Sequence, residues 1–303
     1  CNVAVVTNIG RGDHLGLSDI NTSEEVAVVK RIVVENVTLR RGFAVLNADD
    51  PLVVKMADGC PGSVIYFTQN SRNPVTLTHR IQQKRVVYLD KEYIVASSAD
   101  TEQRFALSEI PLTKNGLIRF QIQNVMAAIG AGWALGIDWT FIRAGLANFV
   151  GDTQTVPGRF NFFNYRDATL IADYGHNPDA IEALVDAIDN LPSKKRTVVI
   201  SAAGDRRNQD IRLQTQILGD VFDEVVLYQD QCQRGRADGE VLGLLREGLE
   251  NAGRVSKIRE IYGEFKAIDT VLTNLQAGEL CLILVDQVEQ SLNYIHERVA
   301  AHN

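Results

Sequence analysis

The stretch TLIADYGHNPDAIEALVDAIDN, residues 169–190, contains a strand, a polar turn and a helix in immediate succession. Residues 169–172 are β-branched or apolar, which is typical of a buried strand. Asn177 and Pro178 suit the N-cap and first position of a helix, which we expect to run from Pro178 to Asn190. A strand that passes through a short polar turn into a helix indicates α/β architecture.

The same alternation continues toward the C-terminus. Further strands are predicted at residues 197–201, 224–228 and 280–285, with helices at 210–222, 239–252, 263–275 and from Val288 onward. Strands and helices joined by short connections predict a Rossmann-like open sheet. We therefore expect a C-terminal domain over residues 157–303, after a hinge at Val156-Pro157-Gly158.

The first half predicts a second α/β domain, over residues 1–156. Its strands are expected at 3–9, 43–46 and 63–68, with a Gly-rich loop at 10–16 after the first of them. Short alternating segments between residues 76 and 112 predict a small antiparallel accessory sheet. Residues 120–135 predict an Ala-rich helix, whose small residues permit close packing.

A capping-box pattern marks the first helix. Thr22 supplies the N-cap hydroxyl and Glu25 follows three residues later. This helix is expected to continue to about residue 37, with Val26, Val29 and Val33 on one face.

Composition narrows the class of protein. The 303 residues are 45% hydrophobic and 23% charged, which suits two soluble globular domains. A net charge of -7 and a pI near 5.3 give no basic field for nucleic acid or an anionic membrane surface. The cluster Lys194-Lys195-Arg196 is therefore expected to be solvated surface.

Sequence features also predict a cytoplasmic protein. The four cysteines have no zinc-binding spacing and are expected to be reduced thiols. No apolar run approaches the roughly 18 residues that a membrane span needs. The chain begins with Cys1 and enters an apolar strand at once, so we expect natural sequence upstream of it.

Polar loops follow the predicted strands, at the sheet edge where open parallel sheets bind ligands. The first loop has the spacing Gly10-x-Gly12-x-x-x-Gly16, one residue too long for a dinucleotide fingerprint. Its Arg-Gly-Asp tripeptide is attributed to chance. Asp13 and His14 are candidate metal or phosphate ligands, with ordinary loop polarity as the alternative. Lys30, on the following helix, is by its position a surface cation.

Two later loops are also candidates. Asp173, directly after a strand, can hold a ribose hydroxyl, and helix capping does not account for it or for His176. Asp205 and Arg206 follow a glycine turn and suit a zwitterionic or carboxylate ligand. A salt-bridged loop is the alternative for this pair.

Taken in order, these segments resemble the Mur ligase superfamily over nearly the whole chain. The resemblance rests on TNI…DHLG (7–16), NADD (47–50), DYGHNP (173–178) and GDR (204–206). It implies an ATPase-type central domain, incomplete at its start and carrying the accessory antiparallel sheet, followed by a Rossmann-like C-terminal domain.

The resemblance also implies roles for individual residues. His14 matches a histidine that helps hold magnesium beside the γ-phosphate, and Lys30 a helical lysine that several members carry as a carbamate, a hard oxygen ligand for magnesium. Arg159 matches an arginine that reaches the ATP phosphates. The remaining matches are Gln121 and Asn124 near the adenine, Asp173 at the ribose, and His176, Asp205 and Arg206 toward the amino-acid substrate.

The implied chemistry is amide-bond formation that uses ATP and Mg²⁺. A carboxylate attacks the γ-phosphate and forms an acyl phosphate, which an amine then displaces. The sequence is most similar to a family member that joins arginine to the side-chain carboxylates of a poly-aspartate backbone. The similarity rests on the segments DHLGL (13–17), TVPGRF (155–160), AAGDRR (202–207), DGE (238–240) and DQVE (286–289). The intact parent is expected to be a homo-oligomer.

The chain departs from the family pattern in one respect. No GxxxxGK[ST] occurs in its 303 residues, although in the family that loop holds the phosphates ahead of the strand at which this sequence begins. We therefore expect this chain alone to be inactive. The rivals are a catalytically silent binding or scaffold module of the same fold and, less favoured by the glycine spacing, a nicotinamide-dependent oxidoreductase.

Overall fold

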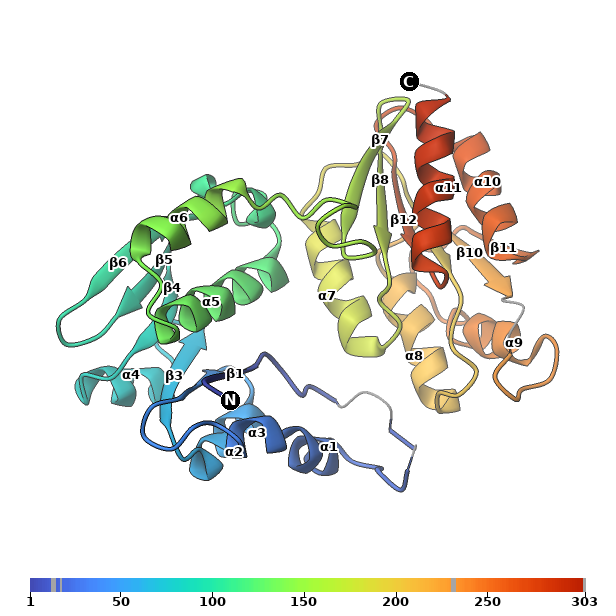
Figure 1. The fold of residues 1–303 in the computed structure, drawn as a ribbon. Coiled ribbons are helices and arrows are strands. Elements are labelled where there is room, and N and C mark those ends of the chain that lie inside the picture. The colour runs from blue at the N-terminus through green and yellow to red at the C-terminus, as the bar shows by residue number, and fades with distance from the viewer. Residues whose placement is uncertain (12–14, 17, 230–232, 302–303) are drawn as a thin grey trace. The chain divides into compact units, whose positions relative to one another are not determined.

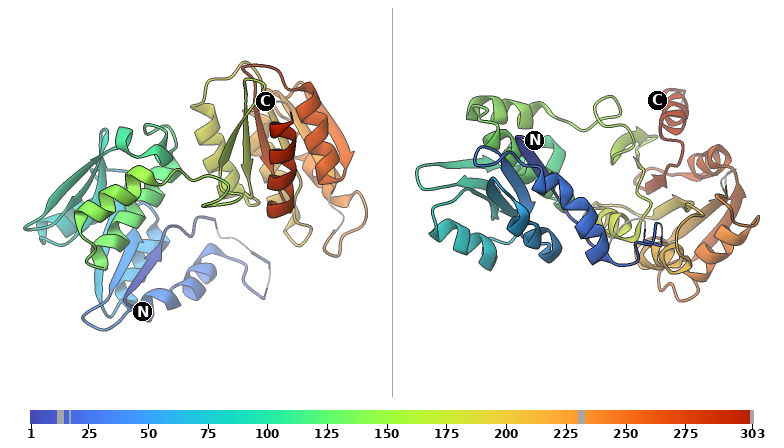
Figure 2. Two further views of the ribbon diagram at one scale, coloured as in Figure 1. Left: turned by 45° about the horizontal axis from the view of Figure 1, so that its top comes forward. Right: turned by 60° about the horizontal axis from the view of Figure 1, so that its bottom comes forward.

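The computed structural model describes residues 1–11, 15–16, 18–229 and 233–301. The chain forms two compact units, Cys1–Val150 and Gly151–Asn303, and each is described by itself (Figures 1 and 2). Each unit contains a six-stranded sheet with helices packed against it, so the α/β prediction is confirmed. Among the described residues, no helix has the length and apolarity needed to cross a membrane.

The sheet of the first unit has the strand order β1-β2-β3-β4-β5-β6. Its strands are β1 (Val3–Val6), β2 (Phe43–Asn47), β3 (Ser63–Thr68), β4 (Val86–Asp90), β5 (Tyr93–Ser97) and β6 (Glu102–Ala106). Strands β1 to β4 are parallel, and β5 and β6 continue the sheet in antiparallel pairing. The predicted antiparallel strands therefore exist, and they extend the parallel sheet through β4.

The first helix of the first unit begins at the cap that the sequence indicates, and five further α-helices are described in this unit. The helices are α1 (Ser23–Lys30), α2 (Ile32–Glu35), α3 (Pro51–Lys55), α4 (Pro74–Ile81), α5 (Arg119–Ala134) and α6 (Trp139–Asn148). Thr22 and Glu25 form both hydrogen bonds of the capping box. Of the apolar residues predicted on one face, Val26 is buried, whereas Val29 and Val33 are 56% and 45% exposed.

Helix α5 covers the centre of this sheet. Its apolar residues pack with Val45 of β2 and with Ile65 and Phe67 of β3 in one core. Gly130 permits the approach, because a Cβ at this position would lie 2.7 Å from Val45 Cγ1. The close packing that the sequence predicts for this helix is confirmed.

The sheet of the second unit has the order β11-β10-β9-β12-β8-β7, with only β7 antiparallel. Its elements are β7 (Asn161–Tyr165), β8 (Ala168–Asp173), α7 (Pro178–Asp189), β9 (Arg196–Ile200), α8 (Asn208–Gly219), β10 (Glu224–Gln229), α9 (Glu240–Glu247), β11 (Lys257–Tyr262), α10 (Glu264–Asn274), β12 (Leu280–Leu284) and α11 (Val288–Ala300). Along the chain, β8 to β11 progress across the sheet, and α10 returns to insert β12 between β8 and β9.

The helices divide between the two faces of this sheet. Helices α7, α8 and α9 lie side by side, and α10 packs with α11 (Figure 1). The division follows from the right-handed rule for crossovers between parallel strands. The connection through α10 crosses the sheet in the opposite direction to the earlier connections, so its helix lies on the other face. Side chains of α10 and α11 share one core with Val199, Val226 and Cys281.

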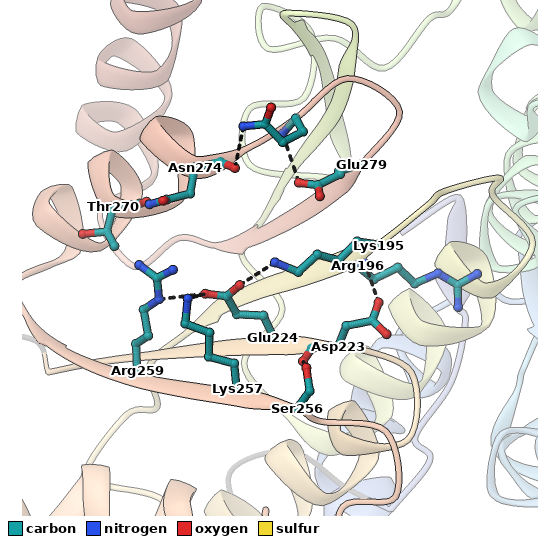
Figure 3. Close-up of polar contacts among 11 residues, drawn as sticks. Lys195, Arg196, Asp223, Glu224, Ser256, Lys257, Arg259, Thr270, Asn274 and Glu279 are labelled. Atoms are coloured by element: carbon teal, nitrogen blue, oxygen red, sulfur yellow. Dashed lines mark hydrogen bonds and ion pairs between the residues drawn. The ribbon is translucent and has the colours of Figure 1, made fainter.

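The cluster at residues 194–196 differs from its prediction as solvated surface. Arg196 is 8% exposed, and its Nη1 lies 2.7 Å from Asp189 Oδ1. Lys195 Nζ lies 2.6 Å from Glu224 Oε2, and Arg259 Nε lies 2.8 Å from Glu224 Oε1 (Figure 3). Lys194 is exposed as predicted, whereas Lys195 and Arg196 are held in ion pairs at the amino-terminal ends of the strands, which the solvated-surface prediction missed.

Candidate functional site

The loops at the carboxyl ends of β1 and β2 are joined by Asp50. Its Oδ2 accepts hydrogen bonds from the backbone N–H groups of Ile9 (2.7 Å) and Gly10 (3.1 Å). Its Oδ1 accepts from Leu52 and Val53 in the first turn of α3. One N-cap carboxylate therefore also holds the start of the loop that contains the predicted ligand His14.

The loop after β3 is tied to the same edge through Asp49. The carboxylate of Asp49 accepts from the hydroxyl of Thr68 and from the backbone N–H of Gln69 (2.8 Å). The side-chain amide of Asn73 donates to Ala48 O (2.8 Å) and to Asp49 Oδ1 (3.2 Å). The NADD segment thus organises the carboxyl edge of three neighbouring strands.

The predicted adenine residues lie near this edge. Gln69 Nε2 donates to Arg119 O (3.1 Å), which connects the β3 loop to the start of α5. One turn on, Asn124 Nδ2 donates to Gln121 Oε1 (3.0 Å), and Gln121 is buried. The two side-chain amides are therefore ordered by each other at the start of the helix, and adenine binding stays a prediction.

The predicted metal ligands receive no direct support. His14 lies outside the described residues. Lys30 is exposed in the last turn of α1. Within the described ranges, no group of three or more His, Cys, Asp or Glu side chains could hold a metal ion. Binding of magnesium by His14, and by Lys30 as a carbamate, stays a prediction.

A pocket opens at the carboxyl ends of the strands in the second unit. Its walls come from the loops after β8, β9, β10 and β12, beside the place where β12 is inserted and the strand order reverses. The lining residues are Tyr174, Gly175, His176, Ser201, Ala202, Ala203, Arg206, Tyr228, Arg234, Leu284, Val285 and Asp286. Two of the predicted substrate residues, His176 and Arg206, therefore meet in one pocket.

Asp173, predicted to bind a ribose, holds the backbone at the back of this pocket. Its Oδ2 accepts from Phe160 N (2.7 Å) and its Oδ1 from Gly175 N (2.6 Å). Burial raises the pKa of this carboxyl, while the two backbone hydrogen bonds and the charges of Arg159 and His176 act against that rise. The side chain links the hinge segment to the β8 loop, and ribose binding stays a prediction.

Arg159 and His176 both lie close to the ring of Tyr174. The Arg159 guanidinium lies 5.6 Å from the centre of that ring, and the His176 ring lies 4.8 Å from it. Nδ1 of His176 is 2.9 Å from Tyr174 O, a distance at which the protonated nitrogen donates. Arg159 is exposed, so its cation lies at the surface beside the pocket residues Tyr174 and His176.

The loop that contains Asp205 and Arg206 is fastened to the segment after β10. A Cβ on Gly204 would lie 2.1 Å from Gln233 O, so only glycine permits this approach. The Arg236 guanidinium donates to Gly204 O (2.5 Å) and to Arg206 O (2.6 Å). Two loops that are distant in the sequence thus form one wall.

Charged groups of both signs meet at this wall. Arg234 Nη1 lies 3.3 Å from Asp205 Oδ2, and its Nη2 lies 3.9 Å from Asp286 Oδ1. Arg206 Nη1 is 3.6 Å from Asp205 Oδ1. The salt bridge that was the alternative for residues 205 and 206 is therefore present, and Arg206 also lines the pocket.

Arg234, Arg236 and Asp286 were missed by the sequence reasoning. Their partners come from other loops, so no local motif indicates them. One signal in the sequence points to Asp286, because it begins the segment DQVE (286–289), which is part of the family resemblance.

Comparisons with known proteins show which family both units resemble. A family model described as the Mur ligase middle domain matches residues 1–132, and one described as the Mur ligase glutamate ligase domain matches residues 158–284. The cyanophycin synthetase of Crocosphaera subtropica is 35% identical over 299 residues, which cover 98% of this chain and 34% of that protein. The chain thus spans about one third of the length of this curated relative.

Solved structures share the fold. E. coli FolC in complex with ADP has a TM-score of 0.70 at 20% identity, covering 99% of this chain and 63% of that one. A bifunctional folylpolyglutamate synthase/dihydrofolate synthase with Mn, AMPPNP and L-glutamate bound has a TM-score of 0.65 at 18% identity, covering 97% and 62%. At these identities the likeness concerns the fold, and both proteins were solved with a nucleotide bound.

Proposed function

This chain belongs to the Mur ligase family of ATP-dependent amide-bond ligases, and on that premise we propose that it corresponds to the C-terminal part of a cyanophycin synthetase-like ligase. The observation that carries the proposal is the pocket at the carboxyl ends of β8, β9, β10 and β12. It combines Arg206 and Arg234 with Asp286, which suits a ligand that bears both charges.

The proposed reaction joins the α-amino group of arginine to side-chain carboxylates of a poly-aspartate backbone, in the cytoplasm. ATP supplies the phosphoryl group that converts the acceptor carboxylate to an acyl phosphate, and Mg²⁺ offsets phosphate charge. The 35% identity to a cyanophycin synthetase over almost the whole chain supports this substrate pair.

The residues of this chain would bind and orient the reactants. Gln121 and Asn124 would contact adenine, and Arg159, exposed just after the hinge, would pair with phosphate oxygens. Arg206 would bind the α-carboxylate of the incoming amino acid, while His176 borders the same pocket. Positioning and charge neutralisation account for most of the rate in such transfers.

We propose that turnover requires a phosphate-binding loop in addition to these residues, because GxxxxGK[ST] is absent from the 303 residues. Loss of a single preorganised donor costs on the order of 10² to 10³ in rate, so a chain without the whole loop should release no phosphate. A ligase of this kind would regain activity when the loop is supplied.

The test compares the chain alone with a fusion in which the preceding segment of a cyanophycin synthetase, including GxxxxGK[ST], is joined to Cys1. Arginine-dependent phosphate release from Mg-ATP with a poly-aspartate primer is expected only from the fusion. A fusion that folds but binds no Mg-ATP would instead favour the silent binding or scaffold module. Binding of NAD(H) would favour the oxidoreductase.

A further inference from the structure

The pocket of the second unit already contains one guanidinium between two carboxylates. Arg234 reaches Asp205 with Nη1 (3.3 Å) and approaches Asp286 with Nη2 (3.9 Å). The first contact is a hydrogen bond, whereas the second is an ion pair too long for one. The arrangement is therefore asymmetric, and Asp205 holds Arg234 more closely than Asp286 does.

Asp286 stands on a rigid support. Its backbone N–H donates to Glu264 Oε1 (3.0 Å), the N–H of Gln287 donates to Oε2 (3.2 Å), and the hydroxyl of Ser291 donates to Oε1 (2.6 Å). Glu264 itself is 3% exposed. The preceding residue, Val285, donates its N–H to Asp173 O (2.8 Å). The backbone that carries this carboxylate is thus fixed on both sides.

Arg234 has a less constrained position. It has a positive φ of 49° in the turn before Gly235, and its side chain is 38% exposed. A long side chain that leaves a partly exposed turn can change rotamer without disturbing the sheet. Of the two residues in the long ion pair, Asp286 therefore has the more firmly held backbone, whereas Arg234 leaves a turn.

We propose that Asp286 is a specificity-determining residue that binds the cationic end of the substrate's side chain, and that Arg234 is an internal competitor for the same carboxylate. The proposal rests on the proposed function, in which this pocket accepts the incoming amino acid. When the substrate enters, its guanidinium takes the place of the 3.9 Å contact, and Arg234 keeps its hydrogen bond to Asp205. Arg206, which is buried and lines the same pocket, pairs with the α-carboxylate.

This arrangement predicts that the pocket distinguishes amino acids by the charge of the side chain and by the paired N–H groups of a guanidinium. L-Citrulline has the length of L-arginine but a neutral ureido group, so it cannot form the charge-assisted pair. Hydrogen bonds to charged groups are worth about 1.5–3 kcal/mol, which corresponds to a preference for arginine of about 10- to 100-fold. L-Lysine should fall between the two, because it has the charge without the bidentate fork.

The test is isothermal titration calorimetry of the full 303-residue chain with L-arginine and with L-citrulline. Asp286→Asn should lose most of the preference for arginine and leave citrulline binding unchanged. Glu289→Gln is the matched control, since Glu289 is exposed in the first turn of α11 and does not line the pocket, and it should keep the preference. Thermal unfolding of each variant checks that the fold is retained.

Arg234→Ala gives a test of opposite sign. Removal of an internal competitor should tighten arginine binding and leave citrulline binding unchanged. Equal weakening of both ligands would show that Arg234 binds the α-carboxylate, and would overturn its role as a competitor. An unchanged arginine preference in Asp286→Asn would overturn the role of Asp286 while leaving amino-acid binding intact. If wild-type chain binds neither ligand, the proposed function fails together with the inference.

Discussion

At the scale of single residues, carboxylates that accept hydrogen bonds from backbone N–H groups organise both candidate sites. Asp50 serves four backbone N–H groups, Asp173 serves two, and Glu264 serves two together with a hydroxyl. Each of these acids lies near the end of a strand, which the sequence can indicate. The sequence does not indicate which backbone N–H groups will donate to each carboxylate. Asp173 illustrates the difference, because the ribose prediction concerned a ligand and the structure shows a link between segments.

Glu224 permits a test of charge pairing at this scale (Figure 3). Burial would raise the pKa of this carboxyl, but the hydrogen bond and charge of Lys195, with Arg259 and Lys257, lower it overall. Since the pKa is lower in the folded state, the stabilisation is present above the unfolded value of about 4.3 and is lost as the pH falls through the folded value.

We expect Glu224→Gln to lower the free energy of unfolding by about 1–3 kcal/mol at pH 7, because it leaves clustered cations around a buried neutral amide. The difference from wild type should shrink below about pH 4. Urea denaturation of both proteins between pH 7 and pH 3 measures this difference in the free energy of unfolding. Glu247→Gln, which removes an exposed partner of Arg212, should change the free energy by at most about 1 kcal/mol. A difference that grows in acid would contradict this assignment.

At the scale of elements, local signals were reliable where the cause is local. The Thr22 capping box, the Asn177 N-cap with Pro178 and the bounds of β3 were all predicted from neighbouring residues. The burial of a helix face was not, because it depends on what packs there. Val26 is covered, whereas Val29 and Val33 on the same predicted face remain exposed.

This difference in burial can be measured with one valine from α1 and one from α2. Val34 of α2 is 0% exposed, so Val34→Ala should lower the free energy of unfolding by about 1–3 kcal/mol through lost burial and a cavity. Val29→Ser should change it by no more than about 0.5 kcal/mol, because Val29 is mostly exposed. Guanidinium denaturation of the two variants measures both free energies of unfolding. Similar losses would indicate that Val29 is covered in solution.

The two loops that form the pocket wall offer a second test on elements. Gly204→Ala would place a Cβ 2.1 Å from Gln233 O and force the segments apart. We expect a loss of about 1–3 kcal/mol in the free energy of unfolding and faster amide exchange at residues 203–206. Gly243→Ala is the control, since no atom lies within 4 Å of its Cβ and it is inside α9. That change should stabilise the chain by up to about 1 kcal/mol.

At the scale of the whole molecule, the alternation of strands and helices was sufficient to predict two α/β units. The order of strands within each sheet was not predictable in the same way. The insertion of β12 between β8 and β9 brings Asp286 to the pocket, and no spacing of residues in the sequence predicts this insertion. Asp286 was missed for this reason, and Arg234 was missed because its partners come from other loops, whereas His176 and Arg206 lie in polar loops that were recognised after predicted strands.

The central proposal concerns the whole molecule: these 303 residues would supply the amino-acid pocket of an amide ligase, and turnover would need a phosphate-binding loop in addition to them. The most direct measurement is mass spectrometry of a poly-aspartate peptide incubated with Mg-ATP, L-arginine and the fusion that carries GxxxxGK[ST]. The account predicts mass increments of whole arginine residues with the fusion and none with the chain alone. Arginine addition by the chain alone, or none by a folded fusion that binds Mg-ATP, would contradict it.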